Sequence, residues 1–308
     1  MDVDRVAPEL RRPAQRASFL PTDRRIGRAF LRTALRLMPA AKVDGVTIET
    51  PRGVEPGVRV YRPAIVRAPA ALLWIHGGGF VIGRAAQNDR FCGTVARELG
   101  IVVVSVEYRK APEHRFPAGL DDCQAGWTWM LRQAVALGID PARVAVGGES
   151  AGGGLAASLV QRLHDAGGTQ PAAQWLFCPM LDDRTAARRE LDGVGHLVWT
   201  NRLNRSGWRS YLGVEPGAVS AAPYAGAARR DDLTGLPPAW VGVGDIDLFA
   251  DEDRDYAERL RASGVHATLD VVPGAPHGFE IWAPDSTLAR EYVTRAHAWL
   301  RGTLEVPD

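Results

Sequence analysis

The stretch that most constrains this 308-residue chain is 144–155, which reads VAVGGESAGGGL. An apolar run, typical of a buried strand, ends in two glycines, and residues with helical spacing occupy 155–163 beyond three further glycines. The pattern G-x-S-x-G around Ser150 is typical of a strand-to-helix turn so tight that only small residues fit beside the serine. Such a turn exposes the hydroxyl and places the N–H of Ala151 at the helix start, where negative charge is favoured. The alternative is a glycine-rich turn with an incidental serine, so the rest of the chain must decide.

Composition and charge narrow the functional classes. Apolar residues make up 46% and charged residues 24% of the chain, which is ordinary for a globular protein with a large buried core. The formal net charge of +1 gives no reason to expect a nucleic-acid partner or stable association with an anionic membrane. The first 40 residues show no signal-peptide pattern, and three cysteines without metal-site spacing indicate free thiols in a reducing compartment. We therefore expect a cytoplasmic protein without a metal.

Predicted strands alternate with predicted helices along most of the chain. The strands are expected at 46–50, 58–61, 70–75, 101–106, 144–146, 173–177, 239–243 and 267–272. The main helices are expected at 24–38, 118–137, 155–163, 252–263 and 288–300, with another ending at residue 99. This alternation predicts an α/β fold with a mainly parallel sheet and helices on both faces. Regular periodicity is lost over 183–214.

A second glycine cluster follows the predicted strand 70–75. It reads His76-Gly77-Gly78-Gly79, and three consecutive glycines allow backbone N–H groups to approach a ligand without side-chain obstruction. An oxyanion hole requires backbone N–H groups that are accessible in this way. A flexible glycine turn is the plainer interpretation, and His76 is better suited to bracing the loop than to acting as a base.

A nucleophilic serine needs a base and an acid, expected in the order Ser, acid, His. His277 follows the predicted strand 267–272, and three aspartates follow the strand 239–243, so both loops lie at the carboxyl edge of the sheet. Asp251 falls in the first turn of a helix, where an acid suits the dipole. Asp245 is so close to the strand end that bonds to backbone groups are its expected role. Asp247, two residues further on, is the predicted acid.

These motifs in combination resemble the bacterial hormone-sensitive-lipase-like carboxylesterases of the α/β-hydrolase fold. The matching segments are HGGGF (76–80), EYRKAPEHRFPA (107–118), GESAGG (148–153), DLTGLPPAWV (232–241), GDIDLFADED (244–253) and PHGF (276–279). The resemblance implies a mostly parallel eight-stranded sheet flanked by helices, with a helical cap. It implies hydrolysis of short- to medium-chain esters through an acyl-enzyme, without a cofactor. The implied site residues are Ser150, Asp247 and His277 as the catalytic triad, and Gly77, Gly78, Gly79 and Ala151 as the oxyanion hole.

The resemblance also implies how the chain is divided. Residues 1–44 and 183–215 would form the cap, and residues 45–182 and 216–308 the hydrolase core. The predicted helix 24–38 places a set of apolar residues on one side, which we expect to cover the mouth of the site together with 183–215. That set is Ile26, Phe30, Leu31, Ala34, Leu35 and Met38. The cap segments match the family least, which leaves the natural ester undetermined.

The motif 107–118 is interpreted as structural. We expect Arg109 and Glu113 to form an ion pair that braces the oxyanion loop, and the resemblance implies cis peptide bonds before Pro112 and Pro117. The chain departs from the usual family pattern at three positions, none of which removes a catalytic group. They are Lys110 in place of leucine, Glu149 in place of aspartate and Leu248 in place of proline.

Other functions remain open at this level. An amidase or deacetylase would use the same three side chains, and a small-molecule receptor could be built on the same scaffold without catalysis. An interfacial lipase is disfavoured because no segment reads as a long amphipathic lid. A phosphate or dinucleotide site at Gly152–Gly154 lacks both the G-x-G-x-x-G pattern and a Walker lysine. The expected partner is a small-molecule ester, and formation of a homodimer is left open.

Overall fold

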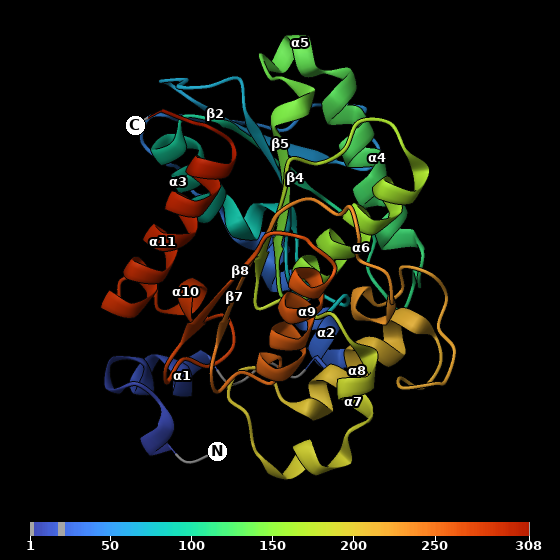
Figure 1. Ribbon diagram of the computed structural model, residues 1–308. Helices are drawn as coiled ribbons and strands as arrows, with labels where there is room; N and C mark the ends of the chain where they lie inside the picture. Colours follow the sequence, from blue (N-terminus) through green and yellow to red (C-terminus); the bar gives the residue numbers. More distant parts are fainter. Residues whose placement is uncertain (1–2, 18–21, 308) are drawn as a thin grey trace.

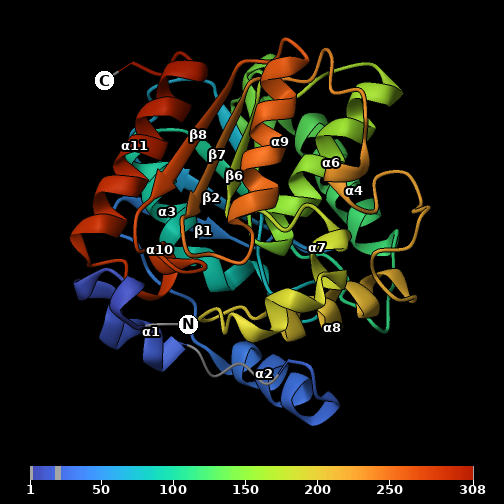
Figure 2. The same ribbon diagram turned by 60° about the horizontal axis from the view of Figure 1, so that its bottom comes forward.

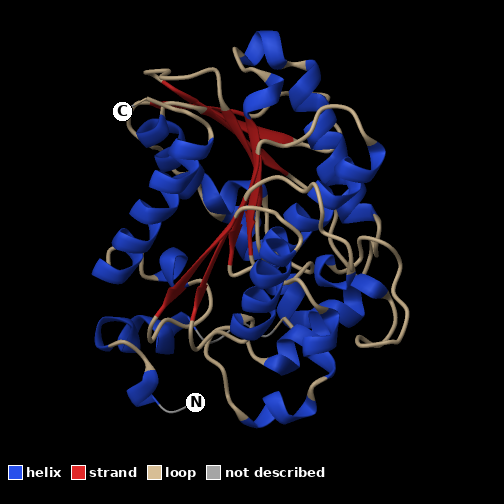
Figure 3. Cartoon of the chain, in the orientation of Figure 1, coloured by secondary structure: helices blue, strands red, loops and turns tan. Residues whose placement is uncertain are grey.

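A computed structural model describes residues 3–17 and 22–307. Its centre is an eight-stranded sheet in the order β1-β2-β4-β3-β5-β6-β7-β8 (Figures 1 and 3). The strands are β1 (Val46–Glu49), β2 (Val58–Pro63), β3 (Ala71–Ile75), β4 (Val102–Val106), β5 (Val144–Glu149), β6 (Ala173–Phe177), β7 (Ala239–Gly244) and β8 (Ala267–Val272). Strand β2 runs antiparallel to β1 and β4, and the strands from β4 to β8 pair in parallel. The predicted α/β-hydrolase architecture is confirmed.

Helices cover both faces of this sheet. In Figure 1, α3 and α11 lie on one side, and α4, α6 and α9 lie on the other. The helices are α1 (Arg11–Ala17), α2 (Arg25–Leu37), α3 (Asp89–Leu99), α4 (Ala118–Arg132), α5 (Ala134–Leu137), α6 (Ala151–Ala166), α7 (Asp183–Ala187), α8 (Asn201–Leu212), α9 (Ala250–Ala262), α10 (Phe279–Trp282) and α11 (Thr287–Thr303). The strands β3, β4, β5 and β6 are buried along their whole length, which explains their continuous apolar runs.

The start of α6 differs from its prediction. The helix begins at Ala151, directly after Ser150, so all three glycines of the run 152–154 lie in its first turn. A Cβ atom on Gly152 would overlap the carbonyl of Ile75, and one on Gly154 would overlap the carbonyl of Met180. The glycines therefore let the helix start pressed against the sheet, and this close packing outweighs their low helix propensity.

Two further predictions concern the loop 107–118. The cis peptide bonds before Pro112 and Pro117 are confirmed. The predicted Arg109–Glu113 pair is wrong, because Arg109 forms its ion pair with Asp122 at 2.9 Å. Asp122 lies on α4, which packs beside the loop, so a tertiary partner replaces the neighbour in sequence.

Glu113 instead pairs with Arg32 of α2, at 2.9 Å. The Arg32 guanidinium also donates hydrogen bonds to the carbonyls of Val81 (2.8 Å) and Ala111 (2.7 Å). These contacts fix which side of α2 faces the core. Figure 2 shows α2 with α1 and α8 at one end of the molecule.

The orientation of α2 corrects the expectation that its apolar residues share one face that packs on the rest of the protein. Leu31 and Leu35 are partly buried against the core, but Ile26, Phe30 and Met38 point outward and are exposed. The sequence pattern misled because the polar contacts of Arg32 fix the rotation of the helix. Of the predicted apolar set, only Leu31 and Leu35 then pack against the core of the described chain. No helix in the described part of the chain is long and apolar enough to cross a bilayer.

Candidate active site

Ser150 occupies the sharp turn between β5 and α6. Its φ of 52° and ψ of −122° are rarely adopted by a residue with a side chain, and such backbone strain is typical of functional turns. Two backbone hydrogen bonds hold the turn: the Ser150 N–H donates to the carbonyl of Phe177 (2.8 Å), and the N–H of Met180 donates to the carbonyl of Ser150 (2.9 Å). The neighbouring strand β6 and the loop after it therefore stabilise the conformation that presents the hydroxyl.

The structure brings the three predicted side chains into one chain of hydrogen bonds. Ser150 Oγ lies 2.9 Å from His277 Nε2, and His277 Nδ1 lies 2.8 Å from Asp247 Oδ2. The second carboxylate oxygen of Asp247 accepts the N–H of Phe249 at 2.9 Å. With the proton on Nδ1 donated to Asp247, Nε2 has a free lone pair and accepts the serine O–H.

The charge state of His277 follows from two opposing effects. Burial disfavours the imidazolium and lowers its pKa, while the carboxylate of Asp247 favours it and raises its pKa; the net pKa is raised. The ring can therefore accept a proton from Ser150 and hold the positive charge within a buried site.

The other two aspartates of the loop have separate roles. Asp245 Oδ1 accepts the N–H of Gly274 at 2.6 Å, so it ties its loop to the loop that carries His277. Asp251 is exposed in the first turn of α9 and lies 3.8 Å from the nearest guanidinium nitrogens of Arg188 and Arg254. The geometry brings only Asp247 of the three to the imidazole.

His76 braces the glycine loop, as the sequence suggested. Its Nδ1 lies 2.7 Å from the carbonyl oxygen of Gly77, and its ring stacks on Tyr108 at a centroid distance of 4.3 Å. Burial holds its pKa well below the usual value, so the ring stays neutral.

The glycine loop offers fewer free donors than expected. The N–H of Gly77 already donates to Glu149 Oε1 at 3.2 Å. The N–H groups of Gly78, Gly79 and Ala151 have no hydrogen-bond partner within residues 3–17 and 22–307. Of the four N–H groups predicted for the oxyanion hole, that of Gly77 is therefore already engaged, and those of Gly78, Gly79 and Ala151 are available within the described residues.

Glu149 acts on this loop from the residue before the serine. In addition to the Gly77 N–H, its Oε1 accepts the side-chain amides of Asn88 (3.2 Å) and Gln87 (3.4 Å). Burial raises the pKa of Glu149, and these hydrogen bonds oppose that rise. In the sequence, Glu149 stood out only as a departure from the usual aspartate. Its contact with Gly77 could not be predicted, because it depends on tertiary packing.

Trp199 is a site residue that the sequence did not identify. It lies in the loop before α8, is buried, and has its ring centroid 6.3 Å from that of His277. Its indole packs so closely on Gly79 that a Cβ there would overlap the ring. Trp199 Nε1 has no hydrogen-bond partner in the described part of the chain. The indole therefore forms a wall beside the proposed oxyanion donors.

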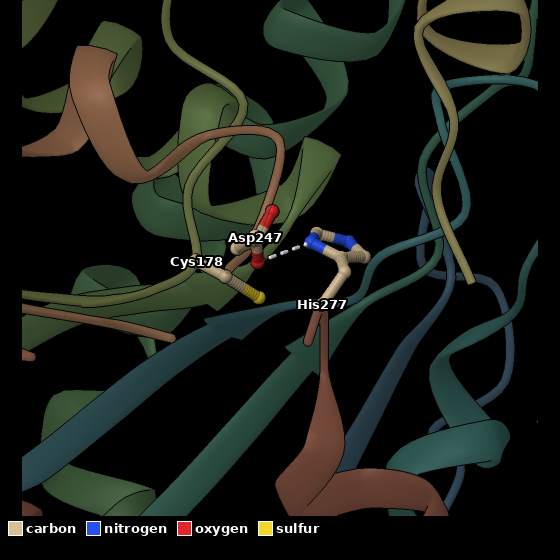
Figure 4. A group of neighbouring side chains, drawn as sticks. All are labelled: Cys178, Asp247 and His277. Atoms are coloured by element: carbon tan, nitrogen blue, oxygen red, sulfur yellow. Dashed lines mark hydrogen bonds and ion pairs between the residues drawn. The ribbon is translucent and has the colours of Figure 1, made fainter. Parts of the chain in front are cut away.

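Cys178 is a second side chain that the sequence left unassigned. Its thiol, a carboxylate oxygen of Asp247 and a ring nitrogen of His277 lie within 4.8 Å of one another. Figure 4 shows the three side chains side by side. These are atom types that can ligate a metal. However, burial keeps the pKa of the thiol well above its usual value, and His277 Nδ1 already bonds to Asp247. This chemistry fits a hydrogen-bonded acid–base pair better than a cation site.

Glu280 lies on α10, three residues beyond His277, and is buried without a described partner for its Oε1. The pKa of Glu280 is raised to about 8, mainly by burial and also by the nearby acids Glu149 and Asp247, while a backbone hydrogen bond and His277 oppose the rise. The carboxyl is therefore largely neutral at pH 7. Its position three residues after the histidine was visible in the sequence, but its burial was not.

The chain is similar to known α/β hydrolases and esterases. A family model described as the alpha/beta hydrolase fold matches residues 72–281. The Carboxylesterase NlhH of Mycobacterium tuberculosis is 34% identical over 280 residues, which cover 89% of this chain and 86% of that protein. Among solved structures, a bacterial heroin esterase aligns with a TM-score of 0.85 and 36% identity, covering 99% of both chains. An esterase of the bacterial hormone-sensitive lipase family aligns with a TM-score of 0.80 and 30% identity, covering 97% and 99%.

The buried acid gives a prediction about stability. The folded-state pKa of Glu280 is about 8, whereas its usual value is 4.5. Near pH 4.5 and below, the carboxyl is protonated in the fold and costs no stability. As the pH rises from 4.5 through about 8, the unfolded state releases this proton more readily than the folded state, so stability is lost. Glu280→Gln cannot ionise, so its melting temperature should match that of the wild type at pH 5 and exceed it by at least about 4 °C at pH 9. The exposed Glu258→Gln is the control. A Glu280→Gln difference that does not change with pH would contradict the burial argument.

Proposed function

Because this chain belongs to the α/β-hydrolase family, among the bacterial hormone-sensitive-lipase-like carboxylesterases, we propose that Ser150, His277 and Asp247 are its catalytic triad. The protein is a carboxylic ester hydrolase of short- to medium-chain esters. The observation that supports the triad is the continuous hydrogen-bond chain from Ser150 Oγ through both nitrogens of His277 to Asp247. The carboxylesterase relatives favour ester hydrolysis over an amidase, a deacetylase or a receptor without activity.

The proposed reaction follows from this geometry. His277 Nε2 takes the proton of Ser150 as Oγ attacks the ester carbonyl, and Asp247 holds the ring tautomer and stabilises the imidazolium. The protonated His277 then gives its proton to the leaving alcohol, which leaves an acyl-enzyme on Ser150. A water activated by the same ring hydrolyses the acyl-enzyme and restores the serine.

The oxyanion of each tetrahedral intermediate needs donors that are free before the ester arrives. The N–H groups of Gly78 and Gly79 on the loop, and of Ala151 at the start of α6, fit this role. Loss of one such donor typically raises the barrier by about 3 kcal/mol. Glu149 supports the same function by fixing the loop through Gly77.

The cap is also proposed, with the boundaries expected from the sequence. Residues 183–215 contain α7 and α8, and their loop places the Trp199 indole on Gly79. Residues 1–44 contain α1 and α2 at the same end of the molecule (Figure 2). A rigid indole beside the oxyanion loop limits the length of the acyl group that fits.

The first test concerns the nucleophile. Ser150→Ala should remove nearly all hydrolysis of p-nitrophenyl acetate, because it deletes the attacking oxygen while leaving the packing of the turn intact. A fluorophosphonate should label the wild type at Ser150 and leave the variant unlabelled. Ser158→Ala, a buried serine on α6, should keep its activity and labelling. Labelling of another serine would contradict the assignment of Ser150 as the nucleophile.

The second test separates the neighbouring acids. Asp247→Asn should lower kcat by about 10⁴, because an amide favours the wrong tautomer of His277. Asp245→Asn should cost far less, because within the described residues the Asp245 carboxylate accepts only a backbone N–H of the adjacent loop. The measurement is kcat of both variants at neutral pH. A large loss of kcat in the Asp245 variant, with kcat of the Asp247 variant close to that of the wild type, would reverse the assignment.

The third test concerns acyl-chain length. Trp199→Ala should open space beside Gly79 and raise kcat/KM for p-nitrophenyl octanoate relative to the acetate by roughly tenfold, since each newly buried methylene contributes about 0.8 kcal/mol. Trp299→Ala, which removes a partly buried indole on α11, is the control and should leave this ratio unchanged. An unaltered ratio in the Trp199 variant would show that the indole does not limit the acyl group.

A further inference from the structure

Helix α2 presents bulky apolar side chains to solvent. Ile26, Phe30 and Leu37 are 85%, 70% and 78% exposed, and their spacing of four and seven residues aligns them as one stripe along the helix. Met38, at the end of the helix, extends this exposed surface. We call Ile26, Phe30, Leu37 and Met38 the outer stripe of α2.

The same helix is rich in arginine and has no acidic residue within its bounds. Arg28 and Arg32 turn inward and donate hydrogen bonds to backbone carbonyls. The side chains of Arg24, Arg25 and Arg36 are exposed and form no hydrogen bond or ion pair with the rest of the described chain. Free cations therefore flank both ends of the outer stripe.

The outward orientation is fixed by contacts on the opposite side. Leu31 and Leu35 pack against the core, and Arg32 bonds to the carbonyls of Val81 and Ala111. Arg84, from the loop after the HGGGF motif, donates to the carbonyls of Leu35 and Arg36 at 2.9 Å each. Rolling α2 to bury the outer stripe would break all of these contacts.

We propose that the outer stripe of α2 docks the protein reversibly on an anionic lipid bilayer. Bulky apolar side chains flanked by arginines are the pattern of helices that lie in the bilayer interface, with the cations at the lipid headgroups. The net charge of the whole chain is only +1, so the attraction is local to this helix. This surface is independent of the proposed catalytic chemistry.

Charge also disfavours the other occupant, a second copy of the chain. Two outer stripes packed together would bring two sets of free arginines into one interface, with no carboxylate on either helix to neutralise them. The phosphates of an anionic bilayer supply the opposite charge.

Docking through α2 would also place the site near the lipid. The inner side of α2 contacts Val81, which directly follows the HGGGF motif of residues 76–80. Helices α1, α2 and α8 gather at the same end of the molecule (Figure 2). Apolar esters dissolved in the bilayer would then be presented to the end of the protein that carries the proposed cap.

The test uses the full-length protein and sedimentation with vesicles of phosphatidylcholine alone or with 30% phosphatidylglycerol. We expect binding to the anionic vesicles at low salt, at least tenfold weaker binding to the neutral ones, and loss of binding in high salt. Ile26→Ser/Phe30→Ser and Arg25→Gln/Arg36→Gln should each lower the partition coefficient at least tenfold. These side chains are exposed, so circular dichroism should show an unchanged fold.

The control is Val135→Ser/Val219→Ser, which removes two exposed apolar side chains far from α2 in the sequence and should leave vesicle binding unchanged. Absence of binding to anionic vesicles, or binding that the α2 variants do not weaken, overturns the proposal. Sedimentation velocity without lipid distinguishes the alternative. A dimer that Ile26→Ser/Phe30→Ser dissociates would assign the stripe to self-association and also overturn the proposal.

Discussion

The site depends on how closely the first turn of α6 lies against the sheet. A side chain at Gly152 or Gly154 would overlap a backbone carbonyl, so the helix can begin where it does only because these positions lack Cβ atoms. That placement gives Ser150 its unusual backbone angles and leaves the N–H of Ala151 open. Displacing the helix outward would separate the hydroxyl from His277 and the Ala151 donor from the glycine loop.

Around this turn, burial sorts the acids into distinct electrostatic roles. Asp247 accepts a backbone N–H and pairs with His277. Glu149, Glu280 and Asp253 are buried and form no ion pair with a cationic side chain in the described part of the chain, and burial raises the pKa of each. Of the acids around His277, Asp247 does most to raise the pKa of the imidazole, so the proposed imidazolium is stabilised mainly by the carboxylate that touches it. Glu149 has a separate role, because it holds the glycine loop through the N–H of Gly77.

The end of the molecule where the cap is proposed combines two opposite kinds of surface on α2 and on the loop before α8. The loop before α8 buries Trp199 against Gly79, whereas α2 exposes its bulkiest side chains and holds the core mainly through arginine–carbonyl hydrogen bonds. Both elements touch the loop that begins with the HGGGF motif. The proposed oxyanion donors and the surface proposed to dock on lipid therefore lie on elements that contact the same loop.

Much of this protein is determined by the sequence alone, because short-range patterns fix its strands, the serine turn and the loops that hold Asp247 and His277. Strands β6 and β8 have the predicted bounds, and Asp247 was selected over Asp245 by its place in the loop. Only the tertiary structure decided which groups meet across the chain. Arg109 forms its ion pair with Asp122, and the N–H of Gly77 donates to Glu149. Trp199 packs on Gly79, and the outer stripe of α2 faces solvent. The physical reason is that such contacts depend on competition among partners distant in sequence, whose distances are set by packing and leave no local pattern.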